Sequence, residues 1–350
     1  MTALDASATV RHIRHRLATR RRLVTLALCL LLVLTFAAAL YLGDYPVPPG
    51  EVVRSLLSPF TGLVDKGVDF IVLNVRLPRA TLAVLTGMSF ALSGIIFQTL
   101  LRNPLASPDI IGISHGASAA AVFCIIMLGL SGFAVALGAL AGAVLTALVI
   151  YALSWRGGVT AYRVVLIGIG MAAIMGAVMS WLFTRARLFE VQKALGWLVG
   201  SLNASNSGDI AIIAVALVIL MPATMLLVRA LDAMQLGDDT ARALGTRVEA
   251  VRLSLMLVAV AYAAFATSAV GPVTFVAFVA GPIARNLLAG SGKGFSQAAL
   301  VGALVMLGSD LVAQHALPAV QLPVGVVTGV FGAGFLLWLL VVSNQAGKVN

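Results

Sequence analysis

Long apolar runs recur along this chain, and they constrain its fold more than any other feature. One of them lies between Arg79 and Arg102 and contains no charged residue. About twenty apolar residues in a helix cross the hydrocarbon core of a bilayer, and a helix satisfies its own backbone polar groups there. Of the 350 residues, 61% are hydrophobic and only 10% are charged, unlike a soluble domain. The sequence therefore predicts an all-α polytopic membrane protein.

The positions of these runs predict ten spans. We expect them at 23–43, 77–101, 110–129, 133–155, 162–184, 208–229, 248–270, 273–288, 296–316 and 323–343. An even number of spans places both termini on one side of the membrane. With the N-terminus in the cytoplasm, sixteen of the 23 Lys and Arg residues fall on the cytoplasmic side. The positive-inside rule favours this orientation.

Polar segments divide the chain further. The predicted parts are a basic cytoplasmic arm at 1–22, a transmembrane domain at 23–343 and a cytoplasmic tail at 344–350. Residues 43–69 are expected to form an exterior loop with a surface helix. Residues 185–206 have helical apolar spacing but are too polar to span, so they lie at the outer surface or partly re-enter. Residues 230–247 are typical of a short surface helix that contacts a soluble partner.

Charged residues inside the spans are scarce, which bears on the class of protein. An ion-coupled secondary transporter needs an ionisable group at mid-membrane depth. Apart from Asp310, near the outer end of its span, the predicted spans offer none at that depth. A membrane-embedded enzyme is also disfavoured, because no acids or metal ligands converge: Asp238-Asp239 lacks a second acidic cluster, and His115 and His315 lack metal-ligand spacing. We predict no metal and no catalytic residue. The net charge of +10 does not lie on a soluble domain, so a nucleic-acid partner is not expected.

Glycine is abundant within the predicted spans. Gly138 and Gly142 form a G-x-x-x-G pair, and Gly168 and Gly325 belong to further glycine stripes. Close helix packing explains most single glycines of this kind. A pathway for a bulky solute, lined by small residues, is the functional alternative.

Several motifs together resemble a known family. They are Arg76-Leu77-Pro78-Arg79, Arg102-Asn103-Pro104-Leu105-Ala106, Gly112-x-Ser114-x-Gly116-Ala117, Gly237-Asp238-Asp239-x-Ala241-x-x-Leu244-Gly245, Gly271-Pro272-Val273-x-Phe275-Val276 and Leu322-Pro323-Val324-Gly325. These motifs, in this order, resemble those of the FecCD family, the permease subunits of ATP-binding-cassette (ABC) importers for iron-siderophore, haem and cobalamin. Within the family, the residues of these motifs are most similar to those of ferric-enterobactin-type permeases. An exterior arginine of cobalamin permeases corresponds to Gln314 here.

The resemblance implies a type II ABC importer permease fold in the bacterial cytoplasmic (inner) membrane. Its expected partners are a second permease subunit, with a related chain favoured over an identical copy, two ATPase subunits and an extracytoplasmic siderophore-binding protein. ATP and Mg would bind to the ATPase, so this chain is expected to bind no cofactor and to be no enzyme itself. A ferric siderophore is the expected cargo, with haem or cobalamin as alternatives.

The resemblance also implies roles for individual residues. Arg76 and Arg79 would meet acidic residues of the binding protein, with two parallel hydrogen bonds from each guanidinium to a carboxylate. The remaining expected sites are a cytoplasmic gate at Asn103, Leu105, Ala161 and Tyr162, an ATPase-coupling segment at Leu236, Asp238, Asp239, Arg242 and Leu244, and a pathway wall at Ser114, His115, Gly116, Gly168 and Thr328.

Overall fold

The computed structural model describes residues 3–43, 45–61, 65–156, 158–203, 205–317 and 320–346. Within these ranges the regular structure is helical, apart from one isolated bridge between Leu317 and Val320. The elements are α1 Ala3–Tyr41, α2 Pro49–Thr61, α3 Lys66–Asp69, the π-helix η1 Phe70–Arg76, α4 Leu77–Leu100, α5 Ile113–Ile126, α6 Phe133–Ser154, α7 Ala161–Arg185, α8 Leu188–Leu198, α9 Ser207–Gln235, α10 Asp238–Ala243, α11 Val248–Val270, α12 Val276–Leu288, α13 Phe295–His315 and α14 Val324–Ala346.

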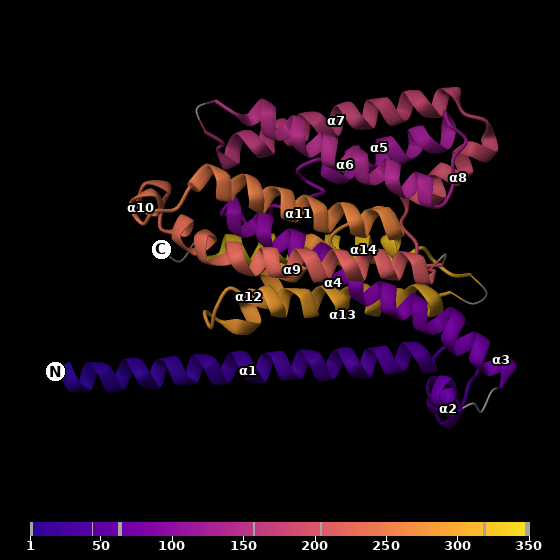
Figure 1. The fold of residues 1–350 in the computed structure, drawn as a ribbon, viewed down its shortest axis with the longest axis horizontal. Helices are drawn as coiled ribbons and strands as arrows, with labels where there is room; N and C mark the ends of the chain where they lie inside the picture. Colours follow the sequence, from indigo (N-terminus) through magenta and orange to yellow (C-terminus); the bar gives the residue numbers. More distant parts are fainter. Residues whose placement is uncertain are drawn as a thin grey trace.

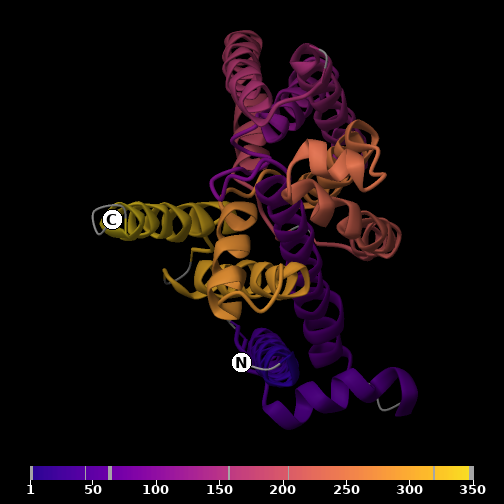
Figure 2. The same ribbon diagram turned by 90° about the vertical axis from the view of Figure 1, so that its left-hand side faces the viewer.

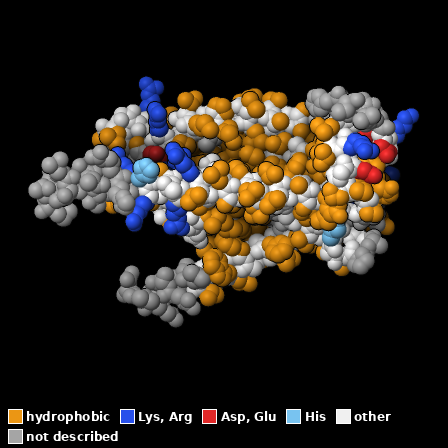
Figure 3. All heavy atoms as spheres, turned by 90° about the horizontal axis from the view of Figure 1, so that it is seen from below, with side chains coloured by type: hydrophobic (Ala, Val, Ile, Leu, Met, Phe, Trp, Pro, Cys, Tyr) orange, Lys and Arg blue, Asp and Glu red, His pale blue; other side chains and the backbone are white. Residues whose placement is uncertain are grey.

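Each of the ten predicted spans coincides with a helix. Seven of the described helices are long and apolar enough to cross a membrane. The other three spans correspond to shorter apolar helices at Ile113–Ile126, Val276–Leu288 and Val324–Leu339. On the face drawn in Figure 3, a broad hydrophobic band separates charged side chains at the two ends of the molecule. This is the surface expected of a bundle embedded in a bilayer.

The long helices lie side by side (Figure 1), with α10 at one end of the bundle and α2 and α8 at the other. Helix α1 begins and helix α14 ends at the α10 end, as an even number of spans requires. The view along the bundle in Figure 2 shows α1 at one edge and α7 at the opposite edge. Helix α1 packs mainly against α13, and α7 packs against α5 and α6.

Helix α4 is the centre of the bundle. The most apolar stretch of the continuous helix Lys66–Leu100 is 78% buried, more than in any other long apolar helix of the described chain. It packs against α9, α11, α12 and α13. A methyl group on Gly94 would overlap the carbonyl oxygen of Ala277 in α12, and one on Gly87 would overlap the carbonyl oxygen of Gly302 in α13. Glycine is therefore required where these backbones meet.

The helix that contains α4 begins earlier than the predicted span. Asp65 caps its start by accepting hydrogen bonds from the backbone N–H groups of Gly67 and Val68. The π-helical segment η1 lies directly before Pro78. Proline cannot donate a backbone hydrogen bond within a helix, and a wider helical turn is a recognised way to accommodate such an interruption. Part of the predicted exterior loop is therefore helix.

Two predicted polar segments are also more helical than expected. The described part of the 1–22 arm, from Ala3, continues without a break into the first span as α1. Likewise α9 runs on to Gln235, so the 230–247 segment contributes its first residues to a membrane helix and only α10 is separate. Helix α8 occupies the 185–206 segment and lies at the end opposite α10, where it contacts α5.

The contact at Gly94 predicts a sharp difference between two glycine substitutions. Gly94→Ala should destabilise the chain by about 1–3 kcal/mol, the usual cost of overpacking, and lower its thermal unfolding midpoint in detergent. Gly170 in α7 is the matched control, because no heavy atom lies within 4 Å of the position that an added methyl group would take there. Equal unfolding midpoints for Gly94→Ala and Gly170→Ala would show that the α4–α12 approach is not tight.

Candidate functional site

An arginine–carboxylate cluster joins α4 to α13 at the end opposite α10. The guanidinium of Arg79 donates to both carboxylate oxygens of Asp310, at 3.0 Å from Nε to Oδ2 and 2.9 Å from Nη2 to Oδ1. Gln314 donates to the same carboxylate at 2.7 Å, and Arg79 Nη1 donates to the Gln321 side chain at 3.1 Å. Asp310 is buried. Its charge is therefore compensated by an ion pair and a hydrogen bond, as a buried carboxylate requires.

Arg76 has a different environment from Arg79. Its buried guanidinium donates to the backbone carbonyl oxygens of Leu40, Tyr41 and Tyr45, at 2.9, 2.9 and 2.5 Å. These groups lie at and just beyond the C-terminal end of α1, where carbonyls lack partners within the helix and a positive charge is favourable. In this structure the donors of Arg76 stabilise the end of α1, and its contact with a partner protein stays a prediction.

A pocket of about 170 Å³ opens beside these two arginines and is also lined by Asp310, Gln314 and Gln321. Of the two predicted docking residues, Arg79 has the more accessible contact, because its hydrogen bond from Nη1 to the Gln321 side chain lies at an exposed position. A carboxylate of a partner would reach Arg79 only by sharing it with Asp310. The docking role of Arg79 therefore stays a prediction.

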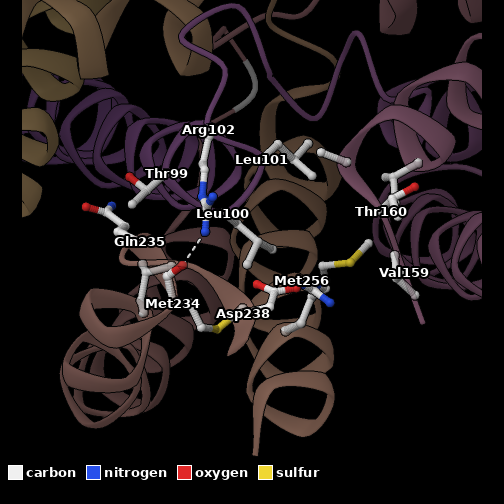
Figure 4. A pocket seen from close by; sticks show the side chains of 14 residues that line it. Thr99, Leu100, Leu101, Arg102, Val159, Thr160, Met234, Gln235, Asp238 and Met256 are labelled. Carbon is white, nitrogen blue, oxygen red and sulfur yellow. Dashed lines mark hydrogen bonds and ion pairs between the residues drawn. The ribbon is translucent and has the colours of Figure 1, made fainter. Parts of the chain in front are cut away.

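A second pocket, of about 250 Å³, lies at the α10 end between the ends of α4, α7, α9 and α11 (Figure 4). Among the residues around it are Arg102, Ala161, Asp238 and Arg252. Arg102 points toward the last turn of α9 and donates through Nη2 to the carbonyl oxygen of Met234. The structure thus brings one predicted gate residue, Ala161, and one predicted coupling residue, Asp238, to the same pocket.

The turn after α4 is held by its own asparagine. The side-chain oxygen of Asn103 accepts a hydrogen bond from the backbone N–H of Leu105 at 2.9 Å, a common turn-forming contact of asparagine. Leu105 is half-buried, whereas Tyr162 on the facing segment is exposed. Asn103, Leu105 and Tyr162 do not line the pocket. Their part in a gate stays a prediction.

Helix α10 presents the predicted coupling residues. Leu236 before it and Leu244 after it are 67% and 64% exposed. Asp239 and Arg242 form an exposed ion pair of 2.9 Å within the helix. Asp238 instead points back to the bundle and pairs with Arg252 of α11 at 2.7 Å. The two exposed leucines that flank this six-residue helix form a small apolar surface that a protein partner could cover.

The predicted pathway wall divides in the structure. A methyl group on Gly116 would overlap Thr146 of α6, and one on Gly168 would overlap the carbonyl oxygen of Ile111. Both glycines therefore allow close helix packing, and their place in a pathway wall stays a prediction. Thr328 and Ser114 are buried, whereas His115 is exposed. The exposed side chain keeps its predicted role as a hypothesis.

Asp109 is a residue that sequence reasoning missed. Its carboxylate accepts hydrogen bonds from the Ser114 hydroxyl, at 2.5 Å, and from the backbone N–H of Phe275. It thereby joins the first turn of α5 to the start of α12. Helix α5 is only about 21 Å long, shorter than the predicted span 110–129. Asp109 precedes both the span and the helix, yet its hydrogen bonds place it within the bundle. The left-handed backbone of Gly112, at φ 84°, marks the late helix start.

The fold is that of a multi-span helical membrane protein with arginine contacts at both ends of the bundle. The profile of the FecCD transport family matches residues 30–342. The chain belongs to the FecCD transport family.

Its similar relatives are permease proteins. The ferric enterobactin transport system permease protein FepG of Escherichia coli (strain K12) is 39% identical over 330 residues, which cover 93% of this chain and 98% of that protein. The achromobactin transport system permease protein CbrC of Dickeya dadantii (strain 3937) is 37% identical, with 91% and 90% covered. A solved inward-facing conformation of a metal-chelate type ABC transporter shares the fold, with a TM-score of 0.76, 24% identity, and 91% and 98% covered.

The ion pair between Arg79 and Asp310 predicts a non-additive effect on stability. Removing one partner of a buried pair leaves an uncompensated charge, so Arg79→Gln alone should cost roughly 3 kcal/mol. Arg79→Gln combined with Asp310→Asn should cost less than the sum of the two single changes. Thermal unfolding of the purified chain measures this difference. Glu51→Gln at the exposed start of α2 is the control and should change little, and additive effects would refute the pairing.

Proposed function

We propose that this chain is the permease subunit of a binding-protein-dependent ABC importer and that it moves a ferric siderophore into the cytoplasm. Membership of the FecCD transport family supports the permease role. The relatives named for ferric enterobactin and achromobactin support the class of cargo. The Gln314 position, where the resemblance places an arginine in cobalamin permeases, favours a siderophore over cobalamin.

The observation that carries this proposal is the end of the bundle that bears α10. The exposed Leu236 and Leu244 flank a short helix whose Asp238 is tied to membrane helix α11. An apolar surface of this kind, joined to the spans by an ion pair, suits an ATPase subunit that drives the spans by rigid-body movement. ATP and Mg would bind to that ATPase. We place the α10 end, and with it both termini, in the cytoplasm.

The opposite end of the bundle suits an extracytoplasmic binding protein. It carries α2, α8 and the pocket beside Arg79. We place the second permease subunit against α7 and α14, whose large exposed hydrophobic side chains it would cover. We favour a related chain in that position, as the resemblance to enterobactin-type permeases implies. His115 and the exposed side of α14 would then face a pathway between the two subunits.

Uptake into vesicles tests the proposed function directly. The chain, co-expressed with its partner permease, ATPase and binding protein, should accumulate a ferric siderophore in proteoliposomes only when ATP is supplied on the ATPase side. Uptake that continues with an inactive ATPase would indicate a secondary transporter. Turnover of a substrate by the purified chain alone would indicate an enzyme.

Docking at the outer end should depend on Arg79. Arg79→Glu should weaken the affinity for the binding protein at least tenfold, since like charges would face each other where a guanidinium and a carboxylate are expected to pair. The measurement is titration of the binding protein onto the permease complex in nanodiscs. Arg79→Glu also breaks the ion pair with buried Asp310 and should lower the unfolding midpoint, so affinity is compared only in complexes that remain folded with the ATPase bound. Wild-type affinity of Arg79→Glu for the binding protein would refute a docking role for this residue.

ATPase assembly should depend on the exposed leucines of α10. Leu244→Ser should reduce the amount of ATPase that copurifies, because it removes apolar surface from the contact. Leu188→Ser is a matched control: this leucine is also highly exposed but lies in α8 at the opposite end. A normal ATPase ratio with Leu244→Ser, or an equal loss with Leu188→Ser, would contradict the coupling assignment.

A further inference from the structure

Arg252 is the nearly buried partner of Asp238 in the ion pair between α10 and α11. It lies in the first turns of α11, and its side chain is 12% exposed. One side of its guanidinium pairs with Glu249 of the same helix at 2.9 Å, and the other pairs with Asp238 of α10 at 2.7 Å. The contact with Glu249 orients the guanidinium, and the contact with Asp238 crosses between elements. Within the part of the chain that the structure describes, this is the only side-chain ion pair between α10 and α11.

Helix α10 has few other attachments. Within it, only Ala241 is buried. Glycines flank it on both sides, Gly237 with φ 113° and Gly245 with φ 81°, which are backbone conformations that other residues rarely adopt. The helix is therefore a short rigid segment between two glycine turns. Its position relative to the membrane helices depends on the packing of Ala241, on the ion pair with Arg252 and on the junction with α9.

That junction is the carbonyl oxygen of Met234. It accepts a hydrogen bond from the backbone N–H of Gly237, at 3.2 Å, directly before α10. It also accepts from the guanidinium of Arg102, which belongs to the turn after α4. Figure 4 shows the Arg102 side chain reaching across to this carbonyl. One backbone group thus binds the start of α10 and the turn that carries Asn103 and Leu105.

We propose that Arg252 is a positioning residue that makes α10, the start of α11 and the Asn103 turn move as one unit. The inference rests on the proposed function, because it concerns how a partner ATPase would move the spans. A displacement of α10 pulls α11 through Arg252 and pulls the Asn103 turn through Met234 and Arg102. Arg102, Met234, Asp238 and Arg252 all line the pocket of about 250 Å³. Side chains do not fill this pocket, so the linked elements can move together without a clash.

Removal of the Arg252 charge should separate ATP hydrolysis from transport. In proteoliposomes that hold the complete transporter, Arg252→Gln should lower the siderophore transported per ATP hydrolysed by roughly tenfold, within the range seen when residues that couple two sites are changed. The ATPase should copurify in the wild-type ratio, because Leu236 and Leu244 are unchanged. Arg252→Lys keeps the charge and should restore most of the ratio. A role in folding alone would lower both activities together.

Further variants keep the test decisive. Asp238→Asn should reproduce the effect of Arg252→Gln, and the double variant should be no worse than either single one, because all three lack the same ion pair. If Arg252→Gln fails to fold, Asp238→Asn alone still tests the proposal. Arg156→Gln is the control: it removes an exposed arginine in the turn between α6 and α7 that forms no ion pair among the described residues.

Two results would overturn the inference. One is a transport-to-ATP ratio within twofold of wild type in Arg252→Gln, and the other is loss of the ATPase from both Arg252→Gln and Asp238→Asn, which would make the ion pair a docking contact. These results are distinguishable from failure of the proposed function, because in that case the wild-type transporter itself would show no ATP-driven uptake.

Discussion

The structure depends on the close approach of helix backbones around α4. Lipid tails are as apolar as leucine, so helices in a bilayer associate through tight packing more than through removal of apolar surface from water. Gly94 against Ala277 and Gly87 against Gly302 permit that packing on two sides of α4. Because α4 is held in this way along its length, it is a rigid connection. Arg79 lies at one end of it and the Asn103 turn at the other.

Arginine contacts complete the bundle where glycine packing ends. Arg76 and Arg79 bind the end of α1 and the carboxylate of α13, while Arg102 and Arg252 bind the end of α9 and the start of α10. Each guanidinium offers several donors in a fixed plane, so one side chain satisfies a group that would otherwise lack a partner and also joins two elements. The two ends of the bundle are therefore built on the same chemistry. A permease that responds at both ends needs such connections at each.

Sequence reasoning was most accurate for features that depend on local composition. Each of the ten predicted runs coincides with a helix, and seven of these helices are long and apolar enough to cross a membrane. The surface helix after Pro49 and the separate helix at Asp238 fell within the segments predicted for them. It was least accurate for individual side chains. Along the sequence, Arg252 is only one more cytoplasmic charge, and Asp109 is part of a loop. The sequence around these two residues does not indicate their partners. Their roles depend on the groups that the fold brings beside them.

The sequence by itself determined the number of spans, the membrane class and the resemblance to a permease family, because these follow from hydropathy, charge and motif order along the chain. Only the tertiary structure decided what each polar or small residue does. Arg79 and Asp310 are 231 residues apart in sequence, and Arg76 and Arg79 belong to one motif yet face different elements. Gly116 and Gly168 serve packing because particular neighbours lie against them. The role of each of these residues depends on which helices pack together, and the local sequence does not specify that packing.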